Sequence, residues 1–331
     1  MKNILVTGAA GFIGSNIVRH HLKQGDKVWG VDNLQAGNLK NLASLPNQSS
    51  FKFDQADIRY WPNIKEAIKS ADYIYHMAAV VGQKQVFAKP IDTLLNNIDS
   101  CKIILETMAN IQSKARILLA SSSSVYYYSQ PDENGALHEE ANICLKSGSF
   151  TQQNYPSSKF INELMGLSFC HEAGIDCIMA RLFNVIGINQ SSSYGMVVPT
   201  FIEQALSERP ITVHGTGEQT RSFIDVRDII RAFELLLNNP ASKGQVINVG
   251  DDHEHKIIDL AHLVLKTTQS NSKITYLPYK KAYGVENYVD VDRRRPYLAK
   301  LRQLTNFRPH WAFEQTLQTI VQSYKTPAMI K

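Results

Sequence analysis

The chain has 331 residues, of which 44% are hydrophobic and 20% are charged, and its formal net charge is +5. This composition is ordinary for a globular protein, and the length suits one large α/β domain or a domain with a smaller appended lobe. The chain has no extended block of like charges and no apolar run approaching roughly 18 residues, so its composition indicates neither nucleic acid nor a membrane as a partner.

The first predicted element is a β-branched strand at Asn3 to Thr7. It leads into the turn Gly8-Ala9-Ala10-Gly11-Phe12-Ile13-Gly14, and apolar residues at helical spacing follow as far as Gly25. This order is the context of a dinucleotide-binding turn, because glycines let the backbone approach a pyrophosphate and the helix N-terminus supplies amide donors. A glycine loop that joins strand to helix without a ligand is the alternative.

The second predicted strand, Lys27 to Val31, ends in Asp32-Asn33, and Asp32 lies 18 residues after Gly14. A carboxylate at this distance can accept hydrogen bonds from both ribose hydroxyls of an adenosine, and it would repel a 2′-phosphate. The sequence therefore favours NAD over NADP.

Three further strands and a helix are predicted in the next stretch, the strands at 51–53, 73–76 and 117–120 and the helix at 94–108. Asp57 and Ile58 follow the third strand and could flank an adenine. Met77, Ala78 and Ala79 follow the fourth strand, where small side chains would let a nicotinamide ribose approach.

The fifth strand delivers four serines, Ser121 to Ser124, before Val125-Tyr126. Hydroxyls at the C-terminal end of a parallel strand stand at the edge where such sheets bind ligands. A serine here could orient a sugar hydroxyl. A plain polar turn is the alternative, because serine favours turns.

The stretch Tyr155-Pro156-Ser157-Ser158-Lys159 is predicted to open an amphipathic helix that continues through Phe169. Residues four apart lie on one helix face, so the phenol and the ammonium can point into the same cavity. The lysine charge favours the phenolate of the tyrosine, which makes a base. The same spacing also occurs on ordinary surface helices. The preceding stretch, 129–154, is predicted to be loop-rich and could be a mobile cover.

Together these motifs resemble the extended short-chain dehydrogenase/reductase family, whose members include nucleotide-sugar epimerases, decarboxylases and dehydratases. The resemblance runs through nearly the whole chain in family order. The stretches that carry it are Thr7–Gly14, Asp32–Leu34, His76–Ala79, the serine cluster, Tyr155 with Lys159, Arg181–Asn184, Val197–Pro199 and His214–Phe223.

The resemblance implies an α/β fold, with a Rossmann-type doubly wound parallel sheet and a smaller C-terminal α/β lobe. We expect an NAD-binding domain at 1–182, to which later segments return, and a mainly nucleotide-sugar-binding lobe at 183–331. Sequence pattern agrees, because 196–206 and 226–237 are predicted helices and 246–249 is a predicted strand. The family also implies a homodimer formed through helices 94–108 and 155–173.

The resemblance assigns three catalytic residues. Tyr155 would take a proton from the sugar 4-hydroxyl while C4 passes a hydride to NAD, Ser122 would hold that hydroxyl, and Lys159 would fix the nicotinamide ribose. The implied cofactor-binding residues are Gly8, Gly11, Phe12, Ile13, Gly14, Asp32, Asn33, Asp57, Ile58, Met77, Ala78, Ala79, Asn97, Tyr155, Lys159 and Phe183.

The implied partner on the substrate side is a UDP-sugar. Arg221 would grip its diphosphate with a planar guanidinium. Among the three arginines before Pro296, we expect Arg295 first and Arg294 second to complete the nucleotide pocket. The full set of implied substrate-binding residues is Ser122, Asn184, Val198, Val213, Arg221, Arg294 and Arg295, with the backbone around Val198 and Val213 lining the uracil.

Departures from the family pattern bear on the reaction. Related 4,6-dehydratases carry an Asp-Glu pair directly after the catalytic hydroxyl, and decarboxylases typically carry a glutamate at the position of Ser124, whereas this chain has Ser123-Ser124. The absent acidic residues argue against both of these reactions, although the arginine-rich stretch looks more like the decarboxylase branch. We expect an NAD-dependent UDP-sugar 4-epimerase first, a UDP-glucuronate decarboxylase second and a non-catalytic NAD-binding regulator third.

The four cysteines, Cys101, Cys144, Cys170 and Cys177, show neither a paired metal-binding spacing nor a disulfide pattern. We expect them to be reduced and no metal to be bound. The first strand begins near residue 3 without a preceding cleavage site, so a cytoplasmic protein is expected.

Overall fold

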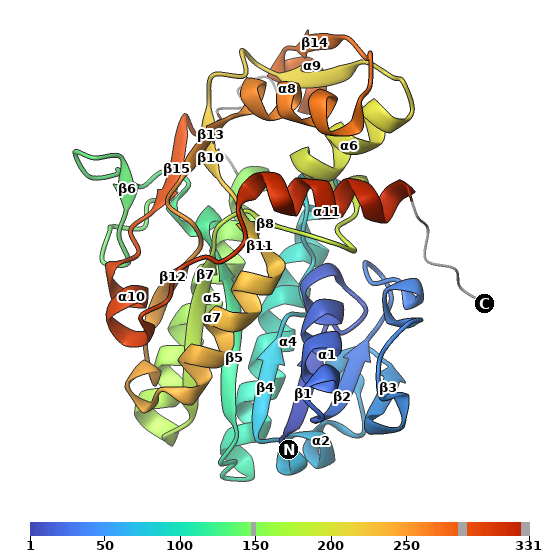
Figure 1. Cartoon of the computed structure of the whole chain (residues 1–331). Coiled ribbons are helices and arrows are strands. Elements are labelled where there is room, and N and C mark those ends of the chain that lie inside the picture. The colour runs from blue at the N-terminus through green and yellow to red at the C-terminus, as the bar shows by residue number, and fades with distance from the viewer. Residues whose placement is uncertain (147–149, 284–289, 326–331) are drawn as a thin grey trace.

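The computed structural model describes residues 1–146, 150–283 and 290–325, and a seven-stranded parallel sheet forms its centre (Figure 1). The strand order is β12-β7-β5-β4-β1-β2-β3. The strands are β1 (Asn3–Thr7), β2 (Lys27–Asp32), β3 (Phe51–Gln55), β4 (Tyr73–His76), β5 (Arg116–Ser122), β7 (Asp176–Leu182) and β12 (Val246–Val249). The chain winds in opposite directions on either side of β1 and β4, which opens a crevice at their carboxyl ends. The predicted Rossmann-type fold is confirmed.

Helices cover both faces of this sheet, because alternate strand residues point to opposite sides. Helices α1 (Phe12–Lys23) and α7 (Val226–Asn238) pack on the face that carries Ile4, Val6 and Tyr75. Helices α2 (Ile64–Ser70), α4 (Pro90–Asn110) and α5 (Phe150–Ala173) pack on the face that carries Leu5 and Ile74. The sheet is therefore packed between two apolar layers below its carboxyl edge.

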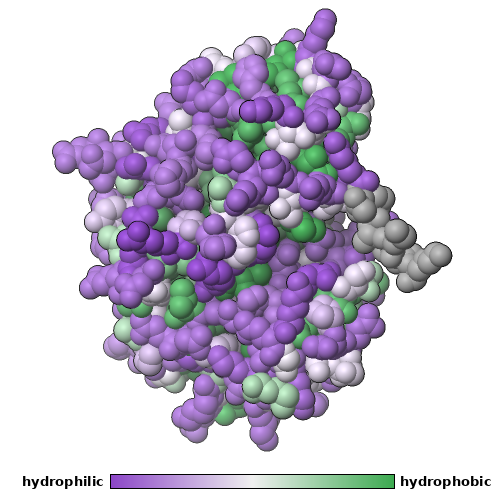
Figure 2. Space-filling view, in the orientation of Figure 1, coloured by the Kyte–Doolittle hydropathy of each residue, from purple (hydrophilic) through white to green (hydrophobic). Residues whose placement is uncertain are grey.

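A smaller α/β lobe stands over the carboxyl edge, on the side away from the N-terminus (Figure 1). Its core lies between α6 (Val197–Leu206), α8 (Ile257–Thr268), α11 (Phe313–Lys325) and the parallel pair β9 (Ile211–His214) and β14 (Ile274–Leu277). On the face shown in Figure 2 the surface is mainly hydrophilic, as expected when the apolar side chains fill two such cores.

Short strands join the lobe to the large sheet. The four-stranded sheet runs β13 (Glu254–Lys256), β10 (Thr220–Ser222), β15 (Arg293–Pro296) and β6 (Ala136–Leu137), and β11 (Ile224–Asp225) pairs with β8 (Val185–Ile186). The remaining helices are α3 (Gln83–Ala88), α9 (Tyr279–Tyr283) and α10 (Ala299–Thr305). No helix in the described ranges combines the length and the apolar content that crossing a membrane requires.

The predicted elements agree with the structure except at the start of α5. This helix begins at Phe150, so Tyr155 lies in its second turn and the predicted loop 129–154 ends too late. Proline favours the first turn of a helix, which makes Tyr155-Pro156 look like a helix start, but here Pro156 lies inside the helix. The predicted loop also contains strand β6, and its residues 147–149 lie outside the described residues.

His76 closes β4 against β1 in a buried position. Its Nδ1 lies 2.8 Å from the hydroxyl of Thr7, and the ring is 3% exposed. Burial, together with the smaller effect of the Lys159 ammonium, lowers the pKa of His76 to about 3. The ring is therefore neutral in the folded protein, whereas an unfolded chain would protonate it near its ordinary pKa of 6.5.

We predict that acidification destabilises the fold through this ring. Because the pKa of His76 is lower in the folded than in the unfolded protein, its contribution to the free energy of unfolding is complete above pH 6.5. This contribution is lost as the pH falls toward 3. Between pH 6.5 and pH 5 the expected loss is about 2 kcal/mol. Urea unfolding of the wild type and of His76→Asn, whose amide can still bond Thr7, should show the smaller pH dependence in the variant. An equal pH dependence in both proteins would contradict the prediction. The control is the same substitution at an exposed histidine, His262→Asn, which should keep the wild-type pH dependence.

Candidate active site

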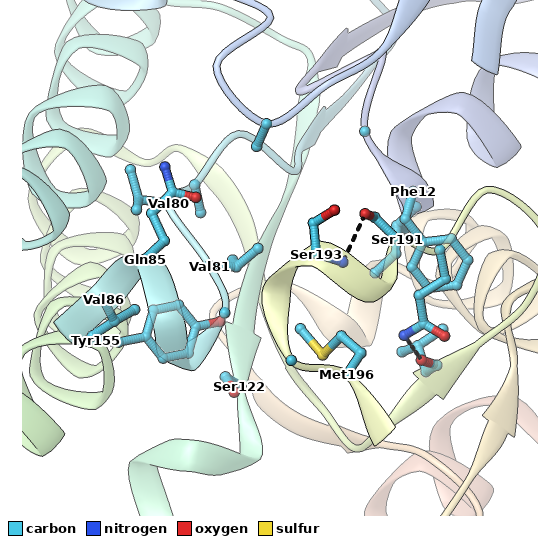
Figure 3. Close-up of a pocket in the computed structure, with 18 of the residues that line it drawn as sticks. Phe12, Val80, Val81, Gln85, Val86, Ser122, Tyr155, Ser191, Ser193 and Met196 are labelled. Carbon is cyan, nitrogen blue, oxygen red and sulfur yellow. Dashed lines mark hydrogen bonds between the residues drawn. The ribbon is translucent and has the colours of Figure 1, made fainter. Parts of the chain in front are cut away.

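A cleft of about 1430 Å³ runs between the carboxyl edge of the large sheet and the small lobe. Its walls come from the glycine turn, from the ends of β2, β4 and β5, from α5 and from the lobe. Figure 3 shows the central part, where Val80, Val81 and Gln85 face Ser193 and Met196 across the cavity. The cleft is therefore where both halves of the molecule can contact one ligand.

The glycine turn at 8–14 lies at one end of this cleft. Gly8 has a φ of +68°, and a Cβ at Gly14 would lie 2.0 Å from the carbonyl oxygen of Gly8, so a larger residue would not fit there. The α1 N-cap is Gly11, which has no side chain to cap the helix. The first amide groups of α1 are thus available to an anion, and the turn fits the pyrophosphate of a dinucleotide.

Asp32 ends β2 beside this turn and is only 8% exposed. Its Oδ2 accepts a hydrogen bond from the amide of Ala10 (3.0 Å), and its Oδ1 accepts one from the amide of Leu34 (2.8 Å). Burial raises the pKa of Asp32, while these amides oppose the shift. A Cβ at Gly37 would lie 2.7 Å from the carboxylate, so glycine there leaves room beside it. The placement fits recognition of ribose hydroxyls.

Asn97, on α4, binds the backbone of the segment that follows β4 and forms one wall of the cleft. Its Oδ1 accepts from the amide of Val80 at 2.7 Å, and its Nδ2 donates to the Val80 carbonyl and to Ser158. Other predicted cofactor-binding residues also line the cleft, namely Phe12, Ile13, Asn33, Asp57, Ile58, Met77, Ala78 and Ala79.

Ser122, Tyr155 and Lys159 meet at the floor of the cleft. Figure 3 shows the phenol of Tyr155, from α5, pointing into the cavity that Ser122 also borders at the end of β5. The ammonium of Lys159 donates to the carbonyl of Ala120 at 2.7 Å and lies 5.9 Å from the centre of the Tyr155 ring. The structure therefore brings the three predicted catalytic residues together.

The expectation that Lys159 lowers the pKa of Tyr155 is wrong for this arrangement. Burial raises the pKa of Tyr155, and a hydrogen bond with Ser122 only partly opposes that shift. Burial also lowers the pKa of Lys159 to about 8, against the opposing effects of Cys101 and Glu163. The physical reason is that burial of the phenol is the largest effect on its pKa, while the ammonium donates its hydrogen bond to the Ala120 carbonyl.

Arg221 and Asn184 lie on the lobe side of the cleft with Val198 and Arg294. The guanidinium of Arg221 donates to Oδ1 of Asp290 and to the carbonyl of Val291, both at 2.7 Å. Asn184 donates to the carbonyl of Ser222 at 2.7 Å. These cleft-lining residues all come from the chain after residue 183, whereas the glycine turn lies near its start.

Three predicted residues do not line the cleft. Phe183 and Val213 are fully buried in apolar cores, and Arg295 donates to the carbonyl of Asn134 at 2.8 Å. Strand alternation explains two of these differences. Thr212 and His214, the neighbours of Val213, line the cleft instead, and on β15 Arg294 lines it rather than Arg295. The placement thus reverses the expected order of the two arginines.

Other lining residues were missed by sequence reasoning. Val80, Val81 and Gln85 follow β4, while Ser191, Ser193 and Met196 come from the lobe. Gln152 lines the cleft three residues before Tyr155. Its spacing would have identified it if α5 had been predicted to start at Phe150, whereas the others carry no local motif.

Comparison with protein families gives a match to the NAD dependent epimerase/dehydratase family over residues 4–250. Among curated proteins, the chain is 29% identical to a UDP-N-acetyl-alpha-D-glucosaminuronate decarboxylase of Bacillus cytotoxicus, over 98% of both chains. It is 30% identical to UDP-glucuronic acid decarboxylase 1 of Danio rerio, over 98% of this chain and 72% of that protein.

Two solved structures are similar throughout. One is a UDP-N-acetylglucosamine 4-epimerase from Methanobrevibacter ruminantium M1 in complex with UDP-N-acetylmuramic acid, with a TM-score of 0.86, 29% identity and 99% of both chains covered. The other is a UDP-glucuronic acid 4-epimerase from Bacillus cereus in complex with UDP-glucuronic acid and NAD, with a TM-score of 0.85, 26% identity and 98% and 100% of the chains covered.

We predict that Asp32→Asn weakens NAD binding about tenfold or more, because hydrogen bonds to a charged acceptor are lost. The affinity for NADP should fall less or rise, since the repulsion of a 2′-phosphate is removed. Calorimetric titration with both dinucleotides measures the ratio, and exposed Glu66→Gln on α2 controls for loss of one charge. An unchanged NAD-to-NADP ratio would show that Asp32 does not contact the ribose.

Proposed function

The chain belongs to the NAD dependent epimerase/dehydratase family, and on this premise we propose that it oxidises C4 of a UDP-sugar to a transient ketone. The observation that carries the proposal is the meeting of Ser122, Tyr155 and Lys159 in one cleft with the glycine turn and Asp32. A cleft shared by the large sheet and the lobe also suits a ligand that must lie against a dinucleotide.

Each residue has a chemical task in this proposal. Ser122 holds the sugar 4-hydroxyl, and Tyr155 accepts its proton. Lys159 is tied to Ala120, so its ammonium stays at a fixed place beside the phenol. The glycine turn and Asp32 would hold NAD, which would supply hydride chemistry at C4. Burial raises the pKa of Tyr155, so the phenolate that this role requires would depend on positive charge that bound NAD would bring to the site.

The proposed outcome is decarboxylation of a UDP-hexuronate. Curated decarboxylases matching along nearly the whole chain support it over the 4-epimerisation expected from sequence. Oxidation at C4 makes the C6 carboxylate part of a β-keto acid. The C5–C6 bond can then break, carbon dioxide leaves, and the electron pair moves onto the C4 oxygen. A proton added at C5 and the hydride returned to C4 complete the product.

The second candidate is 4-epimerisation of a UDP-sugar. It is favoured by Ser124, which stands where related decarboxylases typically have a glutamate, and by the likeness to two UDP-sugar 4-epimerases. In this reaction the ketone turns over and the hydride returns to the other face. Both candidates share the oxidation at C4 and differ only in what the ketone does next.

We predict that the protein with NAD converts UDP-glucuronate or its N-acetylated form to a UDP-pentose-type product with release of carbon dioxide, detected by mass and proton NMR. UDP-glucose and UDP-galactose are tested as substrates in the same way. A product of unchanged mass with an inverted coupling of the C4 proton would show epimerisation instead of decarboxylation. No conversion of any UDP-sugar would overturn the proposal and favour an NAD-binding regulator.

We predict that Tyr155→Phe keeps its affinity for NAD and loses about a hundredfold or more in kcat, because the base is removed.

We also propose that α4 and α5 form a homodimer interface. The two helices pack side by side, and both expose large apolar side chains to solvent. Ile91 is 71% exposed and Leu95 is 50% exposed on α4, while Leu164 is 48% exposed on α5. Large apolar side chains exposed on two adjoining helices suit burial against a second copy.

We predict that Leu95→Glu with Leu164→Glu converts a dimer to a monomer, because charges would be buried at the centre of the interface. Light scattering coupled to size exclusion measures the mass. The matched control is Leu235→Glu on α7, which is 38% exposed away from these helices and should leave the mass unchanged. A wild-type monomer would refute the proposed interface.

A further inference from the structure

A charged pair lies buried directly behind the floor of the cleft. Glu163 on α5 and Arg181 on β7 have side chains that are 1% and 4% exposed. The guanidinium binds the carboxylate through two contacts, Nε to Oε1 at 2.9 Å and Nη2 to Oε2 at 2.7 Å. Neither residue lines the cleft, so the mechanism above does not use them.

The pair is attached to the strand that carries the catalytic serine. The hydroxyl of Ser121 donates to Oε1 of Glu163, and Ser121 is the Cα partner of Arg181 in the ladder between β5 and β7. Ser122 is the next residue of β5. On α5, Glu163 follows Lys159 by one turn and Tyr155 by two, so it lies on the same helix face as both. The pair therefore connects the elements that bear all three catalytic residues.

A second contact of Arg181 reaches the turn after Ser122. Its Nη1 donates to the hydroxyl of Tyr126 at 2.6 Å, and that hydroxyl donates to Oδ1 of Asn248 on β12 at 2.8 Å. The same Nη1 donates to the carbonyl of Glu139 at 3.0 Å. The polar atoms of Arg181 and Glu163 thus have several hydrogen-bond partners, and the bond to Tyr126 fixes the turn that follows Ser122.

Stability alone is a weak reason for such a pair. Exchanging a buried ion pair for apolar residues of similar volume is often neutral or stabilising, because both charges must be desolvated. A buried pair that instead orients catalytic groups has a function that an apolar pair cannot replace.

The charge of Glu163 also acts on Lys159. The groups that face this ammonium are the Ala120 carbonyl on β5, Cys101 on α4, His76 on β4, and Tyr155 and Glu163 on its own helix. Of these, Cys101 and Glu163 raise the pKa of Lys159 against the lowering by burial. Burial lowers the pKa of His76, raises the pKa of the Cys101 thiol to about 12 and raises the pKa of the Tyr155 phenol, so the remaining acidic group among them is the Glu163 carboxylate, which is ion-paired with Arg181.

We propose that Glu163, held by Arg181, is a positioning residue that fixes Ser122 against Tyr155 and places its carboxylate one helical turn beyond Lys159. This proposal rests on the proposed function for its effect on turnover, but its effect on Lys159 is a property of the protein itself. Glu163 acts through Ser121 on the serine and through its charge on the lysine, without touching a substrate.

The test compares two double variants that remove both charges. Glu163→Leu with Arg181→Met removes the Ser121 acceptor as well, whereas Glu163→Gln with Arg181→Met keeps an acceptor. We expect both to move the alkaline limb of the kcat profile to lower pH, because Lys159 loses its proton earlier. The leucine variant should also lose about tenfold or more in kcat at its optimum, with KM changed less than about threefold.

The matched control is Arg116→Met with Asp176→Asn. This ion pair joins the same two strands at their opposite ends, with Nε and Oδ2 2.9 Å apart, and should leave the pH profile unchanged. If the double variants do not fold, Ser121→Ala removes only the hydrogen bond to Glu163. It should lower kcat while leaving the pH profile in place.

A second readout needs no substrate. In protein labelled with ¹³C at the lysine Cε, the Lys159 signal is identified by its loss in Lys159→Met. We expect its titration midpoint near pH 8 in the wild type and lower in both double variants. Variants that fold with the wild-type midpoint and the wild-type kcat would overturn the proposal. A wild type that titrates as expected but converts no UDP-sugar would refute only the proposed function.

Discussion

The hydrogen bond from the Lys159 ammonium to the Ala120 carbonyl is the contact on which the site depends. An ammonium buried among α4, α5 and β4 needs an acceptor, and the last carbonyls of β5 offer one at the carboxyl edge of the sheet. The bond ties α5 to the strand that ends in Ser122, so Tyr155 and Ser122 border one cavity. The glycine turn and Asp32 border the same cleft because β1 and β2 end at the same edge.

Much of this arrangement is predictable from sequence. Some motifs are short stretches whose spacing alone predicts their local structure, namely strand β1 with the turn after it, Asp32 after β2, and the pair Tyr155 and Lys159. The start of α5 was missed because Pro156 lies inside the helix. The choice between Arg294 and Arg295 and the burial of Val213 depend on which face of each strand meets the cleft, and no local pattern records that. The pKa of Tyr155 is the clearest case, because burial raises it and a hydrogen bond with Ser122 lowers it, and the spacing of Tyr155 and Lys159 records neither effect.

The sugar limits which reaction outcomes are possible once C4 has been oxidised. Once C4 is a ketone, a carboxylate on C5 can leave as carbon dioxide without a further acid or base, whereas a hydroxymethyl group cannot. A hydroxymethyl group on C5 therefore allows epimerisation alone, whereas a carboxylate on C5 allows both outcomes. The relatives include a UDP-glucuronic acid decarboxylase and a UDP-glucuronic acid 4-epimerase, so on this sugar the residues around the ketone must decide between the two.

The central claim is that C4 gives up its hydride and receives it back. The most direct measurement uses UDP-glucuronate carrying deuterium at C4, in ordinary water, with the protein and NAD. The account predicts slower turnover than with the unlabelled sugar and a product that keeps the deuterium at C4, whether or not carbon dioxide is lost. Loss of the deuterium to water, or turnover at an unchanged rate with C4 untouched, would contradict it.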